Sequence, residues 1–344
     1  MLDVLIVGQG LAGSTLGYYL SQTSAKFAII DNRHRFSSSK IAGGIVDPLS
    51  GKRLTLSWKA ELLIPFAKQF YESLETVFCR RLITRKNVIR FIRDPITEAL
   101  WPKRRDDPDF HRYIVGSTGI MPGFRLPLEG IETTSSFSIL SESLLTAFTD
   151  YFSNRHLLIS DQFSFSDFRE ETDHIEWRDI RARRVIFCEG SQIIHNPFFD
   201  NIRFRHAKGE VWTIKNTTLP QTHIFCRDHI LLPIGDGAFK YGSTYDWDTA
   251  DWAPSRTGYE KLHASLDEWI PPSTLLVQEA GVRPISRDNH PIVGFHKHRP
   301  KIGVLNGFGS KGFMVAPYYA RQLCQHLLCS HPIDKDVNLN RFIL

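Results

Sequence analysis

The chain has 344 residues, of which 42% are hydrophobic, 23% charged and 12% aromatic. This length allows about two domains, and the composition excludes a mainly disordered chain. The formal net charge of +5 permits an acidic partner without requiring one. The five cysteines form no CxxC pair, which favours free thiols in a reducing, cytoplasmic setting. Because no run of about 18 apolar residues is present, we expect no membrane span.

The N-terminal segment has the pattern of a nucleotide-binding unit. Residues 3–7 form a short β-rich run, and Gly8, Gly10 and Gly13 follow it at the start of a helical repeat. A second apolar run ends at Asp31. In such a unit the glycines allow a tight turn, a close approach to pyrophosphate and close packing of helix on strand. The amides at the helix N-terminus favour the negative charge of the phosphates.

The acid after the second run indicates the type of nucleotide. Asp31 lies 18 residues after Gly13, where a carboxylate can accept a hydrogen bond from a ribose 2′-hydroxyl. An acid here favours FAD or NAD over NADP, whose 2′-phosphate needs a basic residue. The alternative is a glycine turn with a purely structural role. The predicted dinucleotide site contains Gly8, Gly10, Leu11, Ala12, Gly13, Asp31 and Asn32.

Helical and β-rich segments alternate along the rest of the chain. The periodicity predicts helices over residues 62–78, 138–152 and 313–329, and strands over residues 157–159, 174–177, 184–188 and 302–305. Short alternating runs with turn signals fill much of residues 80–135 and 197–275. We therefore predict a discontinuous nucleotide domain of residues 1–79, 136–196 and 276–344. A β-rich substrate domain of residues 80–135 and 197–275 interrupts it.

Several separated motifs resemble one superfamily, that of the FAD-dependent D-amino-acid oxidases and glycine oxidases. They are the Ser-rich, double-glycine stretch 37–45, the strands 185–190 and 208–211, the hairpin 232–244, and the C-terminal motifs 281–284, 291–294 and 306–317. Their order and spacing follow the family over nearly the whole chain. The resemblance implies an α/β (α+β overall) fold: a Rossmann-type FAD-binding domain with an interleaved antiparallel β-sheet substrate domain. Residues 43–48 and 224–228 are most similar to the oxidase module of the bifunctional enzyme that modifies tRNA wobble uridines.

The resemblance implies FAD as the cofactor. Neither Cys nor His occupies the positions at which relatives attach flavin, so we expect non-covalent binding. Backbone amides around Lys311 would face the flavin N1 and O2 edge and stabilise negative charge there; the alternative is a glycine turn before an ordinary packed helix. The implied cofactor-binding residues are Ser39, Gly43, Gly44, Gly190, Arg283, Gly307, Gly309, Ser310, Lys311, Gly312 and Phe313.

Three residues, Arg283, Lys240 and Lys311, are predicted to act in catalysis. Arg283 matches the family's Gly-x-Arg-Pro motif, which implies that its forked donors hold a substrate carboxylate. The alternative is a structural ion pair with an acid such as Asp288. Lys240 matches a lysine that activates oxygen near flavin N5 in a sarcosine oxidase, and its alternative is a solvated strand side chain.

Two departures from the family leave the substrate open. His229 stands in the segment where amino-acid oxidases carry a substrate-contacting tyrosine. Met314 replaces the lysine that holds the carboxylate in sarcosine oxidases.

The reaction implied by the family is oxidation of the C–N bond of an amine or amino acid, by hydride transfer to flavin N5 and hydrolysis of the imine. A small-molecule amine and oxygen or an electron carrier are then the partners. The alternatives are a tRNA-directed oxidase acting on a carboxymethylaminomethyl-type uridine, a non-catalytic dinucleotide-binding protein and a nicotinamide dehydrogenase. Residues 80–105 carry nine basic residues against two acids, so RNA contact is one hypothesis. His296 and His298 have no further ligand nearby in the sequence, and we expect no metal.

Overall fold

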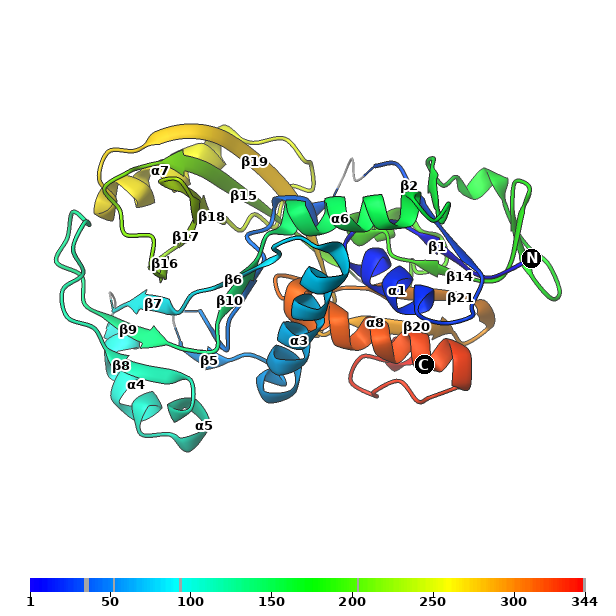
Figure 1. The fold of residues 1–344 in the computed structure, drawn as a ribbon, viewed down its shortest axis with the longest axis horizontal. Coiled ribbons are helices and arrows are strands. Elements are labelled where there is room, and N and C mark those ends of the chain that lie inside the picture. Colours follow the sequence, from blue (N-terminus) through cyan, green and yellow to red (C-terminus); the bar gives the residue numbers. More distant parts are fainter. Residues whose placement is uncertain (34–36, 52, 93–94, 203, 343–344) are drawn as a thin grey trace.

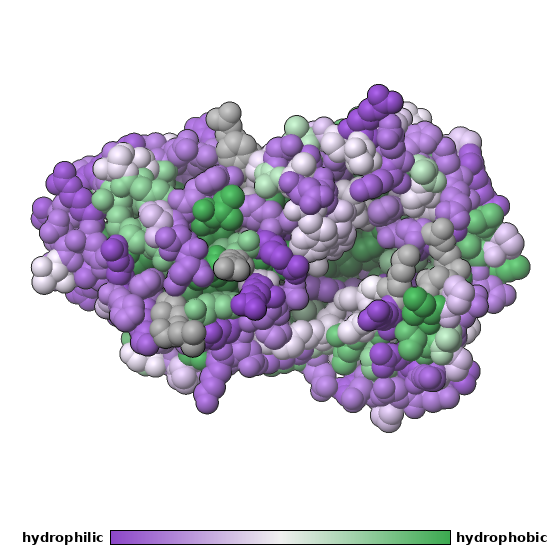
Figure 2. Space-filling model, turned by 180° about the vertical axis from the view of Figure 1, so that it is seen from behind, coloured by the Kyte–Doolittle hydropathy of each residue, from purple (hydrophilic) through white to green (hydrophobic). Residues whose placement is uncertain are grey.

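The computed structural model describes residues 1–33, 37–51, 53–92, 95–202 and 204–342. Two sheets of eight strands lie beside each other along the long axis of the molecule (Figure 1). The sheet that contains the N-terminus lies on the right of this view, and the other lies on the left. The reverse face is mostly hydrophilic, with hydrophobic residues visible in a recess between the two halves (Figure 2).

The first sheet has a parallel centre that is buried on both faces. Its strands run in the order β11 (Leu158–Ser160), β2 (Phe27–Asp31), β1 (Leu2–Val7), β14 (Ile180–Phe187) and β21 (Arg299–Asn306). β12 (Phe168–Glu170), β13 (Ile175–Trp177) and β20 (Ile292–His296) pair with this group in antiparallel fashion. The sequences of these strands are continuous apolar runs, as expected for a parallel sheet whose two faces are covered by helices and loops.

Four helices supply the core of this half. They are α1 (Leu11–Ser21), α3 (Ala60–Phe78), α6 (Ser141–Ser153) and α8 (Gly312–Cys329). Their buried side chains form one cluster with the strands, and it includes Leu16, Leu63, Phe148 and Tyr319. A second cluster on the other side of the sheet includes Phe187 and Phe199. The predicted helices 62–78 and 313–329 correspond to α3 and α8.

The second sheet is antiparallel except at one pair of strands. Its order is β19 (Thr274–Ile285), β15 (Arg205–Lys215), β18 (Ala238–Gly242), β17 (Ile230–Gly235), β16 (Ile224–Cys226), β7 (Val88–Phe91), β9 (Gly130–Thr133) and β8 (Ile114–Ser117). Only β16 and β7 run parallel within this sheet, among the residues described. The helix α7 (Arg256–Trp269) packs on one face through Leu262, Leu266 and Trp269.

Side-chain alternation in this sheet decides which residues face the other half of the molecule. Phe225, Tyr241 and Ile89 lie in the cluster under α7. Because successive side chains of a strand point to opposite faces, their neighbours Cys226, Lys240 and Arg90 point to the other face. That face carries the site described below.

Short elements connect the two halves. β3 (Ile45–Val46), β10 (Phe137–Ile139) and β6 (Ile83–Arg85) form a three-stranded sheet, and β4 (Leu49–Ser50) pairs with β5 (Thr55–Leu56). The remaining helices are α2 (Ser38–Ile41), α4 (Pro95–Arg105) and α5 (Pro108–His111), with short 3-10 turns at Phe165–Asp167, Gly190–His195 and Leu339–Phe342.

The α/β fold class is confirmed, with corrections to its parts. Residues 138–152 do not form one helix, because residues 137–139 form β10 and α6 begins at Ser141. The two segments expected to consist of short strands contain α4, α5 and α7. Leu262, Leu266 and Trp269 have the spacing of one apolar helix face, but this pattern was not recognised because the residues between them are mostly polar. The domain partition stays a prediction, and its boundary at residues 275/276 falls inside β19. No helix in the described part of the chain is long and apolar enough to span a membrane.

Because α1 packs closely on the turn after β1, a single methyl group added at Gly13 should strongly lower the stability of the fold. A Cβ at Gly13 would lie 1.8 Å from the carbonyl oxygen of Gly8, whereas a Cβ at Gly10 would meet nothing closer than 3.8 Å. We expect Gly13→Ala to lower the free energy of unfolding by about 3 kcal/mol, at the upper end of overpacking costs. Gly10→Ala, the matched control, should lower it by at most about 1 kcal/mol, the typical cost of alanine at a helix N-cap. Urea unfolding of both variants as apoproteins measures the difference without a contribution from FAD binding, and equal stabilities would contradict the prediction.

Candidate functional site

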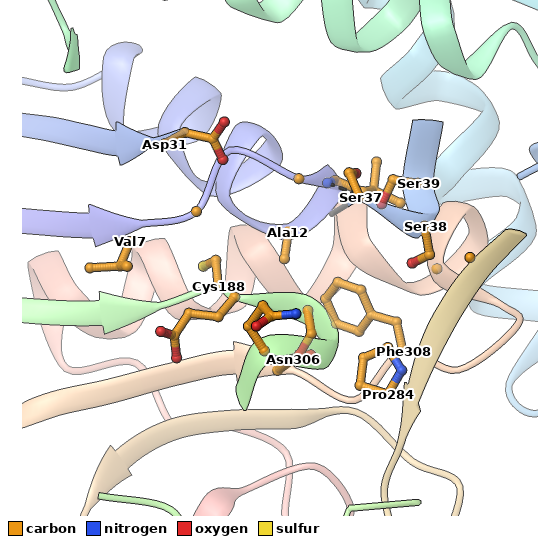
Figure 3. A pocket seen from close by; sticks show the side chains of 18 of the residues that line it. Val7, Ala12, Asp31, Ser37, Ser38, Ser39, Cys188, Pro284, Asn306 and Phe308 are labelled. Atoms are coloured by element: carbon orange, nitrogen blue, oxygen red, sulfur yellow. Dashed lines mark hydrogen bonds between the residues drawn. The ribbon is translucent and has the colours of Figure 1, made fainter. Parts of the chain in front are cut away.

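A cavity of about 750 Å³ opens where β1, β2 and β14 end (Figure 3). This is the edge at which parallel sheets bind ligands. Figure 3 shows Asp31 at one end of the cavity, Ser37, Ser38 and Ser39 along one wall, and Asn306 and Phe308 opposite. We call this space the nucleotide cavity.

The glycine turn leaves room for a group with a pyrophosphate. A Cβ at Gly8 would lie 2.6 Å from the carbonyl oxygen of Cys188, so this position accepts only glycine. At Gly10, the N-cap of α1, the nearest atoms to a Cβ are the hydroxyls of Ser37 and Ser39 across the cavity. The amide of Leu11 donates to the Ser39 hydroxyl at 3.3 Å. A dinucleotide phosphate fits this cradle of amides and hydroxyls at the start of α1.

Asp31 ends β2 at the wall of the same cavity. Its Oδ2 accepts a hydrogen bond from the amide of Gln9 at 2.7 Å. This bond joins the acid to the glycine turn and holds the carboxylate beside the space where a ribose would lie.

The predicted cofactor residues divide into three groups by position. Those on the wall of the nucleotide cavity are Gly8, Gly10, Leu11, Ala12, Asp31, Asn32, Ser39, Gly190, Arg283, Gly309, Ser310, Gly312 and Phe313. Gly43, Gly44 and Lys311 line a second cavity instead. Gly13 packs behind the turn, and Gly307 has a φ of 76° in the turn after β21.

Sequence reasoning missed several residues of the nucleotide cavity. Phe163 and Phe165 come from the loop after β11, and Arg178 comes from the turn after β13. Glu189 directly follows the strand that the sequence identified, and its carboxylate accepts from the Asn196 amide at 2.7 Å. No spacing in the sequence links these segments, because they meet only when the sheet assembles.

The second cavity, of about 360 Å³, adjoins the first and shares Ala42, Val211, Arg283, Ser310 and Phe313 with it. We call it the substrate-side cavity. Lys240, Cys226 and Arg90 line it from the second sheet, while Asp47 and Lys311 line it from the segments after β3 and β21. His229 is also on its wall, and its Nδ1 lies 3.1 Å from the carbonyl oxygen of Ser243.

Arg283 lies where the two cavities meet. Its Nη2 donates to the Ser243 hydroxyl at 2.5 Å, and its guanidinium lies 4.7 Å from the Tyr245 ring centroid. A Cβ at Gly209 would lie 2.1 Å from Nη2, so the guanidinium rests on this glycine. Burial lowers the pKa of Arg283, although an arginine stays charged. The alternative pair with Asp288 does not form, because Arg341 holds Asp288 at 2.7 Å.

Lys240 lies on the cavity side of β18 and is not a freely solvated side chain. Its Nζ donates to the carbonyl oxygen of Ile41 at 2.8 Å. Burial lowers the pKa of Lys240, and the charges of Glu279 and Glu142 partly offset this effect.

Lys311, Asp47 and Arg90 meet at the far side of the substrate-side cavity. Arg90 is 7% exposed and donates to the Asp47 carboxylate and to the carbonyl oxygen of Leu49. Its Nη1 lies 3.4 Å from the sulfur of Cys226. The Lys311 Nζ lies 3.5 Å from the carbonyl oxygen of Asp47. Asp47 and Arg90 were not predicted as site residues, since an acid after a double glycine and a basic strand residue are both common.

The basic segment 80–105 is largely paired with acids. Five of its arginines lie within ion-pair distance of a carboxylate: Arg80 with Asp150, Arg85 with Glu72, Arg90 with Asp47, Arg104 with Asp107 and Arg105 with Asp106. Acids outside the segment therefore reduce its local charge. RNA binding by this segment stays a prediction. In the described part of the chain, no three His, Cys, Asp or Glu side chains gather as they would around a metal ion.

Comparisons with known proteins identify the family and the fold. Residues 3–326 match the family described as FAD dependent oxidoreductase. The glycine oxidase of Bacillus subtilis (strain 168) is 24% identical over 168 residues, which are 46% of this chain and 44% of that protein. The match thus spans less than half the length of this relative.

Solved structures share the fold over almost the whole chain. Glycine oxidase from Bacillus cereus ATCC 14579 has a TM-score of 0.81 at 16% identity and covers 96% of both chains. Iminodiacetate oxidase from Chelativorans sp. BNC1 has a TM-score of 0.79 at 19% identity and covers 99% of this chain and 98% of that one. The α-glycerophosphate oxidase of Mycoplasma pneumoniae, solved with FAD bound, has a TM-score of 0.73 at 17% identity and covers 95% and 94%.

The chain therefore belongs to the family of FAD-dependent oxidoreductases that includes the D-amino-acid oxidases. It is an enzyme of this family, and FAD is its cofactor.

A methyl group at Gly10 tests where the cofactor lies. Gly10→Ala would project into the nucleotide cavity at the start of α1, where backbone must approach the pyrophosphate closely. We expect FAD to bind about tenfold more weakly or worse, which corresponds to about 1.4 kcal/mol of steric cost. Fluorescence titration of the apoprotein with FAD measures this change. Unchanged affinity would place the pyrophosphate elsewhere.

Glu189 predicts a pH dependence of stability. Burial raises the pKa of Glu189 to about 7, and the Asn196 amide opposes this rise. A carboxyl whose pKa is higher in the folded than in the unfolded state destabilises the fold as pH rises from about 4.5 to 7. The natural chain should therefore lose about 2 kcal/mol of unfolding free energy relative to Glu189→Gln as the pH rises from 5 to 8. Urea unfolding at pH 5 and pH 8 measures this change in stability. Glu171→Gln, at an exposed position, is the control. A difference between Glu189→Gln and the natural chain that does not vary with pH would contradict the prediction.

Proposed function

We propose that this enzyme oxidises the C–N bond of an amino acid, by hydride transfer from the α-carbon to flavin N5 and hydrolysis of the resulting imine. The observation that carries this proposal is the position of Arg283 between the two cavities. Among the described residues, no carboxylate forms an ion pair with it. A desolvated guanidinium without an acid favours an anionic ligand strongly, because an unpaired buried charge is costly.

The arrangement around Arg283 supports a carboxylate as that anion. Ser243 and the carbonyl oxygen of Ala207 each accept from one end of the guanidinium, at 2.5 Å and 3.4 Å. The guanidinium rests on Gly209, which has no side chain to displace it, and lies 4.7 Å from the Tyr245 ring centroid. A planar carboxylate matches the fork of donors that remains. Two structural neighbours are named as oxidases of glycine and of iminodiacetate, and both compounds carry an amine beside a carboxylate.

When bound, FAD supplies the acceptor for the two electrons that leave the substrate. The chain's own residues hold the substrate and shape its surroundings. Arg283 fixes the carboxylate at the junction of the cavities, and Phe313 adds an apolar side chain to the wall that the two cavities share. The first amides of α8, from Gly312 onward, face the nucleotide cavity and favour negative charge there.

The identity of the electron acceptor is an extension of this proposal. Lys240 is a cation on the wall of the substrate-side cavity, held by the carbonyl oxygen of Ile41. A fixed positive charge near the flavin favours electron transfer to oxygen, which becomes negatively charged. Lys240 would then act in reoxidation, with FAD bound non-covalently.

An anaerobic panel of amines and amino acids tests the proposed function. The purified holoenzyme is mixed with each compound, and the flavin absorbance is followed. Bleaching by amino acids but not by the matching amines without a carboxylate is the expected result. Bleaching by 2-hydroxy acids alone, or by no amine at all, would overturn the proposal.

Arg283 and Gly209 provide paired variants for the carboxylate site. Arg283→Met should raise the KM for an amino acid about 30-fold or more, since loss of one partner of a desolvated charge pair costs at least about 2 kcal/mol. Arg283→Lys should recover part of the loss, because the charge remains without the fork. Gly209→Ala should raise KM with Arg283 intact, because the new methyl must displace the guanidinium. Steady-state kinetics measure all three, and an unchanged KM in Arg283→Met would refute the assignment.

Lys240→Met separates the two half-reactions. We expect reoxidation of the reduced enzyme by oxygen to slow by about tenfold or more, since one electrostatic contact to a developing negative charge is lost. Reduction by substrate under anaerobic conditions should change much less. Stopped-flow absorbance follows both steps, and equal slowing of both would show that Lys240 has a structural role.

A further inference from the structure

The substrate-side cavity has an excess of positive charge. Among the described residues on its wall, five are basic and two are acidic: Arg90, Arg227, Lys240, Arg283 and Lys311 against Asp47 and Asp228. Arg90 is paired with Asp47, and Arg227 with Glu268 on α7. No carboxylate in the described chain forms an ion pair with Lys240, Arg283 or Lys311. One substrate carboxylate would bring a single negative charge to a wall that carries these three positive charges.

Lys311 is the charge with the fewest contacts. An ammonium group has three N–H donors. The described residues offer Lys311 a single acceptor, the carbonyl oxygen of Asp47, at the long distance of 3.5 Å. Burial lowers the pKa of Lys311, and nearby Arg90 adds to this effect while Asp47 opposes it. An anion in the cavity would offset both the burial and the repulsion.

Asp47 cannot supply that anion, because other groups already hold its carboxylate. Arg90 donates to Oδ2, and the Ser136 hydroxyl and the Leu49 amide donate to Oδ1, each at 3.2 Å. The pair of Asp47 and Arg90 therefore forms a fixed wall behind Lys311. Its net charge is zero, and the charge of Lys311 remains for a ligand.

The positions of the charges across the second sheet give the cavity two ends. Arg283 lies on β19, Lys240 on β18, and Arg90 on β7, five strands away from β19 in the sheet order. Lys311 lies at the Arg90 end, beside Asp47. Arg283 also lines the nucleotide cavity, whereas Lys311 lines only the substrate-side cavity, so the two anion-seeking groups stand at separate places on its wall. A molecule as small as glycine would occupy only the Arg283 end.

The side chain of Lys311 lines the substrate-side cavity and not the nucleotide cavity. Its neighbours Ser310 and Gly312 line the nucleotide cavity, whereas Lys311 lines only the substrate-side cavity. The backbone at this turn thus faces one cavity while the Lys311 side chain enters the other.

We infer that the substrate is an amino acid with a second acidic group, and that Lys311 binds this group while Arg283 binds the carboxylate beside the reacting carbon. The substrate class is a secondary amino acid whose nitrogen carries a carboxyalkyl chain, or an α-amino acid with an acidic side chain. This inference rests on the proposed function for the role of Arg283. It goes beyond that function in assigning Lys311 as a residue that determines specificity.

Binding without turnover tests the second anion site by itself. The holoenzyme is titrated with dicarboxylates from succinate to pimelate and with monocarboxylates of the same chain length, and perturbation of the flavin spectrum gives each Kd. At least one dicarboxylate should bind about tenfold more tightly than its monocarboxylate, as expected for one added charged hydrogen bond. Equal binding across the series would overturn the inference.

Variants of Lys311 show whether this residue carries the preference. Lys311→Met should reduce the ratio of monocarboxylate to dicarboxylate Kd to about one, and Lys311→Arg should keep most of it because the charge remains. Lys261→Met, which changes an exposed lysine on α7, is the matched control and should keep the full ratio. A full ratio in Lys311→Met would also overturn the inference.

Turnover with matched substrates separates this inference from the proposed function. N-(2-carboxyethyl)glycine and N-butylglycine differ mainly in the second carboxylate. We expect the natural chain to favour the first by about tenfold in kcat/KM, and Lys311→Met to lose the preference. Equal bleaching by both would refute the second anion site while leaving the proposed function intact. If neither compound nor any other amine bleaches the flavin but dicarboxylates still bind more tightly, the proposed function fails and the anion site stands.

Discussion

The close contact between the turn after β1 and the strands beside it fixes the geometry of the nucleotide cavity, on which the position of the cofactor depends. Gly8 touches the backbone of Cys188 at the end of β14, and Gly13 touches the backbone of Gly8. These contacts bring α1 down onto the sheet and leave its first amides facing a cavity. The position of the cofactor follows from this packing, since the same edge collects Asp31 and the turn before α8.

The second half of the molecule depends on a simpler constraint, the alternation of side chains along strands. A hydrophobic cluster under α7 takes Ile89, Phe225 and Tyr241. Their neighbours must then face the first half, and three of these neighbours are Arg90, Cys226 and Lys240. Packing of the apolar residues thus places polar chemistry on the opposite face. The same sheet brings Arg283 on β19 over Gly209 on β15, where a larger residue would displace it.

The sequence predicted much of the nucleotide-binding half, because its signals are local. The spacing of three glycines, the apolar run before them and the acid at Asp31 all lie within one continuous segment. The sequence did not predict α7 or the partners of Arg283. The apolar stripe of α7 is interrupted by polar residues, and the neighbour in sequence, Asp288, pairs with Arg341 from the C-terminal end of the chain. Resemblance to a family, and no local pattern, pointed to Arg283, Lys240 and Lys311.

The sequence by itself predicted the glycine turn and a dinucleotide ligand, because both depend on residues that are close along the chain. The resemblance of separated motifs to a family added the fold class and FAD. Only the tertiary structure decided which charges share a cavity. Asp47, Arg90, Arg283 and Lys311 come from four distant segments, and their distances depend on how two sheets pack. It also decided which of these charges are neutralised: Arg90 meets Asp47, whereas Lys311 meets a single carbonyl oxygen. Electrostatic energy depends on separation in space and on burial, and a linear sequence specifies neither.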